Sequence, residues 1–205
     1  MIGTFMAYIL LSGGIIIWPI IMLSIIALAI FIEKTWNLSR DIVLPRNLTA
    51  HIISQIEKKS LSPAMKEKMK KDSVQGSIFF SILEEKIKSK PILRLRAEEI
   101  GRYEINRLEK FLTLLGTIAS VSPILGLLGT VIGMISVFSN LLDSGSNAIA
   151  PLAGGIAEAL VTTAAGLIVA IPSLIFYRSF LRTIENYALE LEEESNKLIH
   201  YISED

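Results

Sequence analysis

The sequence contains no cysteine, and its two histidines, His51 and His200, lie far apart in polar segments. The absence of cysteine excludes disulfide bonds, thiolate catalysis and cysteine-ligated metals. The chain also lacks a glycine-rich phosphate loop after a strand, a metal-spaced histidine and aspartate cluster, and a carboxylate pair suited to acid–base catalysis. We interpret both histidines as solvated surface residues. The sequence therefore predicts no catalytic residue, no metal site, no cofactor and no enzymatic activity.

Charge is absent from two long stretches and nearly absent from a third. Residues 9–32 and 111–142 carry no charged side chain, and residues 151–177 carry only Glu158. Each stretch exceeds the roughly 20 apolar residues that cross a bilayer core about 30 Å thick. Because lipid offers no hydrogen bonds to the backbone, such segments must be helical. The sequence predicts an all-α integral membrane protein with three transmembrane helices in contact with the lipid bilayer.

Lysine and arginine are missing from residues 1–32 and from the short connection at 143–150. Of the 20 basic residues, 17 lie in 33–110 and the other three in 178–205. The positive-inside rule then places the N-terminus outside and the C-terminus in the cytoplasm. The first apolar run has no basic residues before it, so we expect an uncleaved span rather than a signal peptide. The formal net charge of zero argues against nucleic acid as a partner.

These patterns predict six segments. In chain order they are a periplasmic N-terminus with the first transmembrane helix (1–32), a cytoplasmic helical segment (33–110), the second transmembrane helix (111–142), a periplasmic loop (143–150), the third transmembrane helix (151–178) and a cytoplasmic C-terminal helix (179–205).

Several stretches of the polar segments show helical periodicity. Isoleucines and phenylalanines recur on one face in 48–59 and in 77–89. No breaker separates 92–110 from the second span, so we expect one continuous helix over 93–142, about 75 Å long, which Pro123 bends within the membrane. The third helix likewise continues into 179–205, where apolar residues at 3–4 spacing predict packing against another helix. Long second and third helices thus extend into the cytoplasm. We interpret the acidic run 190–194 as a solvated face, with electrostatic pairing to the basic segment 33–110 as the alternative.

Glu158 lies about 10 Å along the third helix from Pro151 and so falls inside the membrane. A carboxylate at such a depth is costly and is by default a functional site, commonly a proton relay. Small or polar residues share its helical face, and these are Gly154, Gly155, Thr162, Ala165 and Gly166. Such a face avoids lipid. The sequence predicts a protonatable site between the second and third transmembrane helices.

The second span carries a matching stripe of small residues. They are Ser122, Gly126, Gly129, Thr130 and Gly133, with Pro123 beside the first. Small residues at this spacing let membrane helices approach closely. We therefore expect Gly126, Gly129, Gly133, Gly154, Gly155, Gly166 and Pro123 to shape helix packing. Under the alternative to a pore role, Thr130 and Thr163 only return their hydroxyls to carbonyls of their own helices.

The motifs "SPILGLLGTVIGM" in the second span and "GGIAEALVTTAAGLIVAIP" in the third resemble the MotA/TolQ/ExbB proton channel family, in the order and spacing of that family. The resemblance is greatest to its ExbB and TolQ members, which share the three-span layout. It implies that Thr130 and Thr163 line a pore and that Glu158 is the helix-three glutamate. Thr162 is added because it shares the face of Glu158, whereas Thr163 lies about 140° around the helix.

The same resemblance implies a bacterial inner-membrane motor subunit. Members of this kind assemble as pentamers, a homo-oligomer whose pore holds ExbD-like single-span subunits. Proton flow through the complex drives a TonB-like energy transducer that powers transport across the outer membrane. Two alternatives remain. One is a TolQ-like subunit of the Tol–Pal system, and the other is a membrane scaffold that conducts no ions and uses Glu158 only for hydrogen bonding.

Overall fold

The computed structural model describes residues 14–85, 89–144 and 149–204, with side chains described outside 140–152 and 204. Over these residues the fold is helical and contains no strand. Three helices are long and apolar enough to cross a membrane: α2, the stretch containing α8, and α9. The predicted fold class, an all-α membrane protein with three spans, is confirmed.

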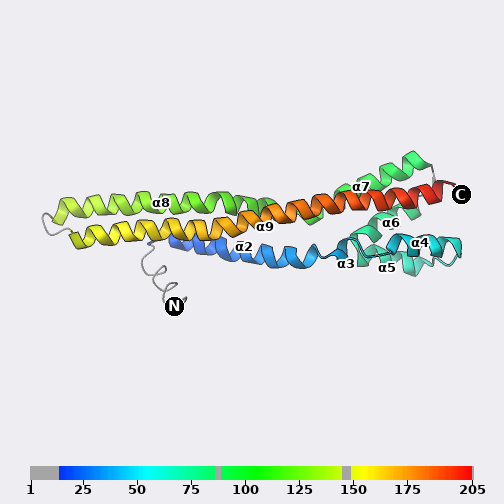
Figure 1. Ribbon diagram of the computed structural model, residues 1–205, viewed down its shortest axis with the longest axis horizontal. Helices are drawn as coiled ribbons and strands as arrows, with labels where there is room; N and C mark the ends of the chain where they lie inside the picture. Colours follow the sequence, from blue (N-terminus) through cyan, green and yellow to red (C-terminus); the bar gives the residue numbers. More distant parts are fainter. Residues whose placement is uncertain (1–13, 86–88, 145–148, 205) are drawn as a thin grey trace. The chain divides into compact units, whose positions relative to one another are not determined.

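The helices follow one another through short connections (Figure 1). Their bounds are α2 Ile17–Asn37, α3 Arg40–Val43, α4 Leu48–Glu57, α5 Pro63–Asp72, α6 Val74–Glu84, α7 Lys90–Glu109, α8 Leu112–Ser144 and α9 Ile149–Glu204. The chain divides into two compact units. The apolar unit comprises the described residues of 1–32 and 111–178, and the polar unit comprises those of 33–110 and 179–205.

In the apolar unit, α8 and the first part of α9 run side by side (Figure 1). The start of α2 packs on α9 through Ile17 and Ile20, which are buried with Ala165. Near the other end of the same unit, the rings of Phe31 and Phe176 stack with centroids 4.2 Å apart. These contacts leave much of the outer surface of the three helices apolar and exposed, as expected for segments that meet lipid.

The predicted continuous helix over 93–142 is interrupted at one place. α7 ends at Glu109 and α8 begins at Leu112, and Phe111 between them has a positive φ of 69°. A non-glycine residue in this region is uncommon. In an unbroken helix the carbonyl of Leu108 would accept from the N–H of residue 112; instead it accepts from the ammonium of Lys34 at 2.8 Å. The α8 helix itself runs through Pro123 without interruption.

Lys34 is 1% exposed, which is unusual for a lysine. Besides the carbonyl of Leu108, its ammonium contacts the carboxylate of Glu33 at 3.3 Å. A cation at a helix C-terminus also interacts favourably with the helix dipole. Lys34 thus satisfies the end of α7 at the point where the helix stops.

The polar unit is held by the C-terminal part of α9. Ile184, Leu191 and Leu198 recur every seven residues and are at most 3% exposed, which confirms the predicted packing face in 179–205. The predicted helices 48–59 and 77–89 correspond to α4 and to α6, and α6 begins earlier because Ser73 caps it by accepting from the N–H of Gly76 at 3.0 Å. Residues 86–88 of the second prediction lie outside the described residues.

The acidic run 190–194 is more than a solvated face. Glu190 forms an ion pair with Arg40 at 2.7 Å, and Glu194 accepts a hydrogen bond from the hydroxyl of Thr49. Burial raises the pKa of Glu194, but hydrogen bonds from Lys197 and Thr49 outweigh it and leave that pKa below its ordinary value of 4.5. The run therefore ties the C-terminal helix to the segment 33–110.

Candidate functional site: an intramembrane carboxyl beside a glycine-lined helix seam

The α8–α9 seam, the contact between α8 and α9 in the apolar unit, is lined by glycines. A β-carbon built on Gly126 would lie 2.9 Å from the Cα of Thr163, and one on Gly166 would lie 2.5 Å from the carbonyl oxygen of Ser122. One on Gly133 would meet Ala159 at 3.1 Å. Because real β-carbons are essentially never closer than 3.0 Å to such atoms, Gly126 and Gly166 lie where only glycine fits the observed helix separation.

The remaining predicted packing glycines divide into two groups. Gly129 faces the side chain of Thr162, and Gly155 faces that of Val137, so both lie in the α8–α9 seam. Gly154 differs from the expectation: among the described residues, nothing lies within 4 Å of a β-carbon built on it.

The three threonines make different hydrogen bonds. Thr130 donates to the carbonyl of Leu127 in its own helix at 2.7 Å, as the alternative to a pore role describes. Thr163 instead donates across the seam to the carbonyl of Gly126 at 3.1 Å. Thr162 donates to the carbonyl of Ala159 at 2.8 Å and also lies 3.5 Å from the carbonyl of Gly126. The hydroxyls of Thr162 and Thr163 thus meet at one carbonyl of α8.

Glu158 lies elsewhere than the sequence predicted. Its carboxyl group packs against Gly14, in the turn that leads into α2, and its side chain is half-buried. The sequence predicted this carboxyl between the second and third spans, whereas its contact with Gly14 places it on the side of α9 that meets the start of the first span. The reason is angular. At 100° per residue, Gly155, Thr162 and Gly166 lie about 40–80° round the helix from Glu158, and α2 and α8 divide that arc between them.

Glu158 and Ala165 share the side of α9 that faces α2. Ala165 is buried together with Ile17 and Ile20 of that helix. One side of α9 thus presents a carboxyl and small apolar residues to the first span, and the adjacent side presents hydroxyls and glycines to the second. Glu158 and Thr163 do point in different directions, but Thr162 belongs with Thr163.

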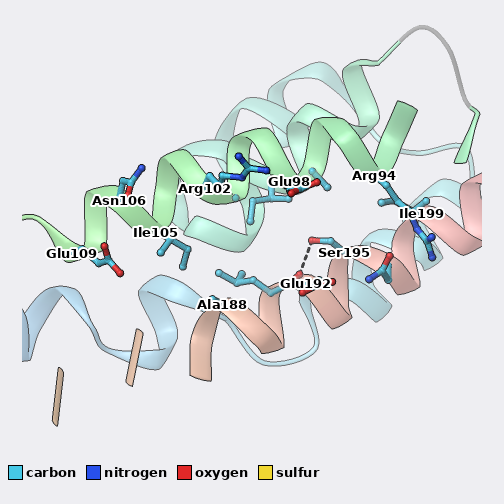
Figure 2. Close-up of a pocket in the computed structure, with 15 residues that line it drawn as sticks. Arg94, Glu98, Arg102, Ile105, Asn106, Glu109, Ala188, Glu192, Ser195 and Ile199 are labelled. Atoms are coloured by element: carbon cyan, nitrogen blue, oxygen red, sulfur yellow. Dashed lines mark hydrogen bonds and ion pairs between the residues drawn. The ribbon is translucent and has the colours of Figure 1, made fainter. Parts of the chain in front are cut away.

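The polar unit contains a groove of about 610 Å³ between α7 and α9 (Figure 2). Charges of both signs lie along it, including Arg102, which pairs with Glu98 at 2.5 Å, and Glu192 on the opposite helix. The hydroxyl of Ser195 in this groove donates to the carbonyl of Leu191 at 2.6 Å. The described part of the chain holds no group of three or more histidine, aspartate or glutamate residues able to bind a metal ion. The groove offers paired charges rather than a reactive centre.

Sequence reasoning missed Gly14 and Lys34. Gly14 falls within the uncharged run 9–32, where nothing distinguishes it from the neighbouring apolar residues except the paired glycines at 13 and 14. Lys34 is one of the 17 basic residues of 33–110, and its burial has no signature in the sequence.

Comparison with known proteins agrees with this architecture. A model of the MotA/TolQ/ExbB proton channel family matches residues 49–193. A Synechocystis sp. protein named biopolymer transport protein ExbB-like 3 is 34% identical over 172 residues, covering 83% of this chain and 82% of its own length. ExbB-like 1 of the same organism is 33% identical over 171 residues, covering 82% and 67%. ExbB of Pseudomonas putida is 29% identical over 195 residues, covering 89% and 57%.

The fold and the site define a helical membrane protein with three potential spans and one carboxyl within the third. The match over 145 of the 205 residues identifies this class further. The chain belongs to the MotA/TolQ/ExbB proton channel family and is a channel subunit of that kind.

Proposed function

We propose that this chain is the stator subunit of an ExbB–ExbD-type motor in the bacterial inner membrane, which uses the proton motive force to energise TonB-dependent transport across the outer membrane. The observation that carries the proposal is Glu158, a carboxyl held inside an apolar helix beside a seam of hydroxyls and glycines. Membership of a proton channel family and relatives named biopolymer transport protein support it.

In this proposal the carboxyl of Glu158 takes up a proton from water or from a neighbouring acid and releases it again. Thr130, Thr162 and Thr163 supply hydroxyls to the pathway. Both Thr162 and Thr163 meet the carbonyl of Gly126, whereas Thr130 donates to the carbonyl of Leu127 within its own helix.

The assembly proposed is a pentamer with ExbD-like single-span subunits in the central pore and a TonB-like transducer as the receiver of work. The exposed apolar side chains on α8, including Ile124, Leu127 and Ile135, leave a large surface for neighbouring copies and lipid. The distribution of basic residues supports a periplasmic N-terminus and a cytoplasmic C-terminus. We assign the chain no enzymatic step.

The TolQ-like alternative belongs to the same family and the same chemistry. The relatives described above carry the ExbB name, which favours the TonB-dependent role. The scaffold alternative differs in mechanism, because it needs a hydrogen-bonding side chain at 158 but no proton exchange.

Glu158→Gln separates the motor from the scaffold. An amide retains hydrogen-bonding capacity but does not exchange a proton at neutral pH. The proposal predicts that Glu158→Gln and Glu158→Ala still assemble with an ExbD-like partner, as seen by native mass spectrometry, while energised uptake in cells is lost in both. Normal uptake in Glu158→Gln together with loss in Glu158→Ala would instead establish the scaffold. Gly154→Ala, whose added β-carbon has no atom of the described residues within 4 Å, serves as the matched control on the same helix.

A further inference from the structure

The carboxyl of Glu158 occupies the place where a side chain at residue 14 would begin. A β-carbon built on Gly14 would overlap Oε1 of Glu158 and would lie 3.0 Å from its Cδ and 3.7 Å from its Cγ. This is a contact with the functional group itself, since the aliphatic part of the side chain is farther away than the carboxyl. Gly14, in the turn that precedes the first span, therefore lies against the carboxyl oxygen of Glu158.

Gly14 is also conformationally special. Its φ is +56°, in the left-handed region, which residues with a β-carbon rarely adopt. The next residues continue as a turn and then as α2 from Ile17. Two independent requirements, the backbone angle and the space taken by the carboxyl, thus call for glycine at this position.

Because Gly14 lies just before α2, its contact with Glu158 brings the carboxyl close to the N-terminal end of that helix. The first N–H groups of a helix have no partner within the helix, and the helix dipole there favours negative charge. The α8–α9 seam offers no such free donors from its threonines, because the hydroxyls of Thr162 and Thr163 already donate to carbonyl oxygens. The carboxyl of Glu158 therefore lies beside the start of α2 and apart from these hydroxyls.

We propose that Gly14 is a positioning residue for Glu158: the absence of a side chain at the start of the first span lets the carboxyl rest against the backbone turn, turned away from the α8–α9 seam. The inference rests on the proposed role of Glu158 in proton transfer. It makes the first span a part of the proton site, in addition to the second and third spans.

The test is a double-substitution cycle in the complete complex reconstituted with its single-span partner. Gly14→Ala is combined with Glu158→Asp, whose side chain is shorter by one methylene and leaves room for a β-carbon. Two quantities are measured: proton flux into liposomes, and the rate at which a lipid-soluble carbodiimide labels the carboxyl at 158. Gly154→Ala, the matched glycine substitution on α9 that meets no atom of the described part of the chain within 4 Å, is the control.

The expected result is coupling between the two positions. In the Glu158 background, Gly14→Ala lowers proton flux at least fivefold and raises carbodiimide labelling at least threefold, because the displaced carboxyl is no longer shielded by the turn at residue 14. In the Glu158→Asp background, the same substitution changes both quantities less than twofold. Gly154→Ala changes neither by more than twofold in either background.

Equal effects of Gly14→Ala in the two backgrounds would overturn the proposal, because backbone strain alone does not depend on the length of residue 158. If Gly14→Ala prevents assembly, the yield of complex replaces flux, and Glu158→Asp must restore that yield. Retained flux in Glu158→Gln would remove the proton role of Glu158, but the labelling rate would still decide whether Gly14 positions its carboxyl. The two failures are therefore distinguishable.

Discussion

A close approach to backbone atoms in the α8–α9 seam makes Gly126→Ala an informative perturbation. A β-carbon at this position would lie 2.9 Å from the Cα of Thr163 and 3.0 Å from the carbonyl oxygen of Thr162. Both are backbone atoms, so neither side chain can rotate away. Ordinary contact begins at 3.4 Å, and the two helices must therefore separate locally by about 0.5 Å, the difference between 3.4 and 2.9 Å.

Such overpacking costs about 1–3 kcal/mol. Separation also stretches the 3.1 Å hydrogen bond from Thr163 to the carbonyl of Gly126; bonds of this type contribute about 0.6 kcal/mol on average in membranes. Against this, alanine stabilises a helix by about 0.5–1 kcal/mol relative to glycine. Gly154→Ala receives the same helix benefit without the clash, because no atom of the residues that the structure describes lies within 4 Å of its β-carbon.

The assay is equilibrium unfolding of the purified complex in bicelles by titration with SDS, followed by circular dichroism. We expect Gly126→Ala to be less stable than Gly154→Ala by about 1–3 kcal/mol, since the helix-propensity gain cancels in the comparison. Equal stabilities, within about 0.5 kcal/mol, would refute the reasoning that backbone contact at Gly126 sets the separation of α8 and α9.

Three further predictions concern single side chains. Thr163→Val should lower the unfolding free energy by about 0.6 kcal/mol while Thr130→Val leaves it unchanged, because only the first hydroxyl crosses between helices; equal losses in the same SDS titration would contradict this. Lys34→Met should cost about 1–3 kcal/mol by stranding the carbonyl at the end of α7, and should accelerate amide exchange in the last turn of α7; unchanged exchange would show that the buried ammonium does not secure this end. Glu194 has a lowered pKa, so its contribution to stability is complete above pH 4.5 and is lost as the pH falls through its folded value. Glu194→Gln should therefore flatten the decline of unfolding free energy below pH 4.5, and an unchanged acid slope would exclude this group as its source.

The apolar runs predicted the spans because length and absence of charge are sufficient signals for a membrane helix. The same signals could not predict where α7 ends. The break at Phe111 contains neither glycine nor proline, and it is compensated by Lys34, 74 residues away in the sequence from the carbonyl that it binds. Contacts of this kind depend on tertiary packing, which periodicity along one helix does not encode.

The candidate site shows the same limit. Periodicity placed Glu158 correctly on the small-residue side of α9, but it assigned the whole side to the second span. The side is wide enough to be shared, and Ala165 and Glu158 face α2 while Gly166 faces α8. The sequence did not show that part of this face packs against the first span. The contacting residue there is Gly14, and a glycine without a side chain leaves no signal in a hydropathy pattern.

Proton flux through the reconstituted complex tests the central claim most directly. Complexes with an ExbD-like partner are placed in liposomes containing a pH-sensitive dye, and a proton gradient with a counter-ion path is imposed. The account predicts measurable flux for the unmodified chain and for Gly154→Ala, and flux at the background of empty liposomes for Glu158→Gln in fully assembled complexes. Undiminished flux in Glu158→Gln would contradict the assignment of Glu158 as the group that carries the proton.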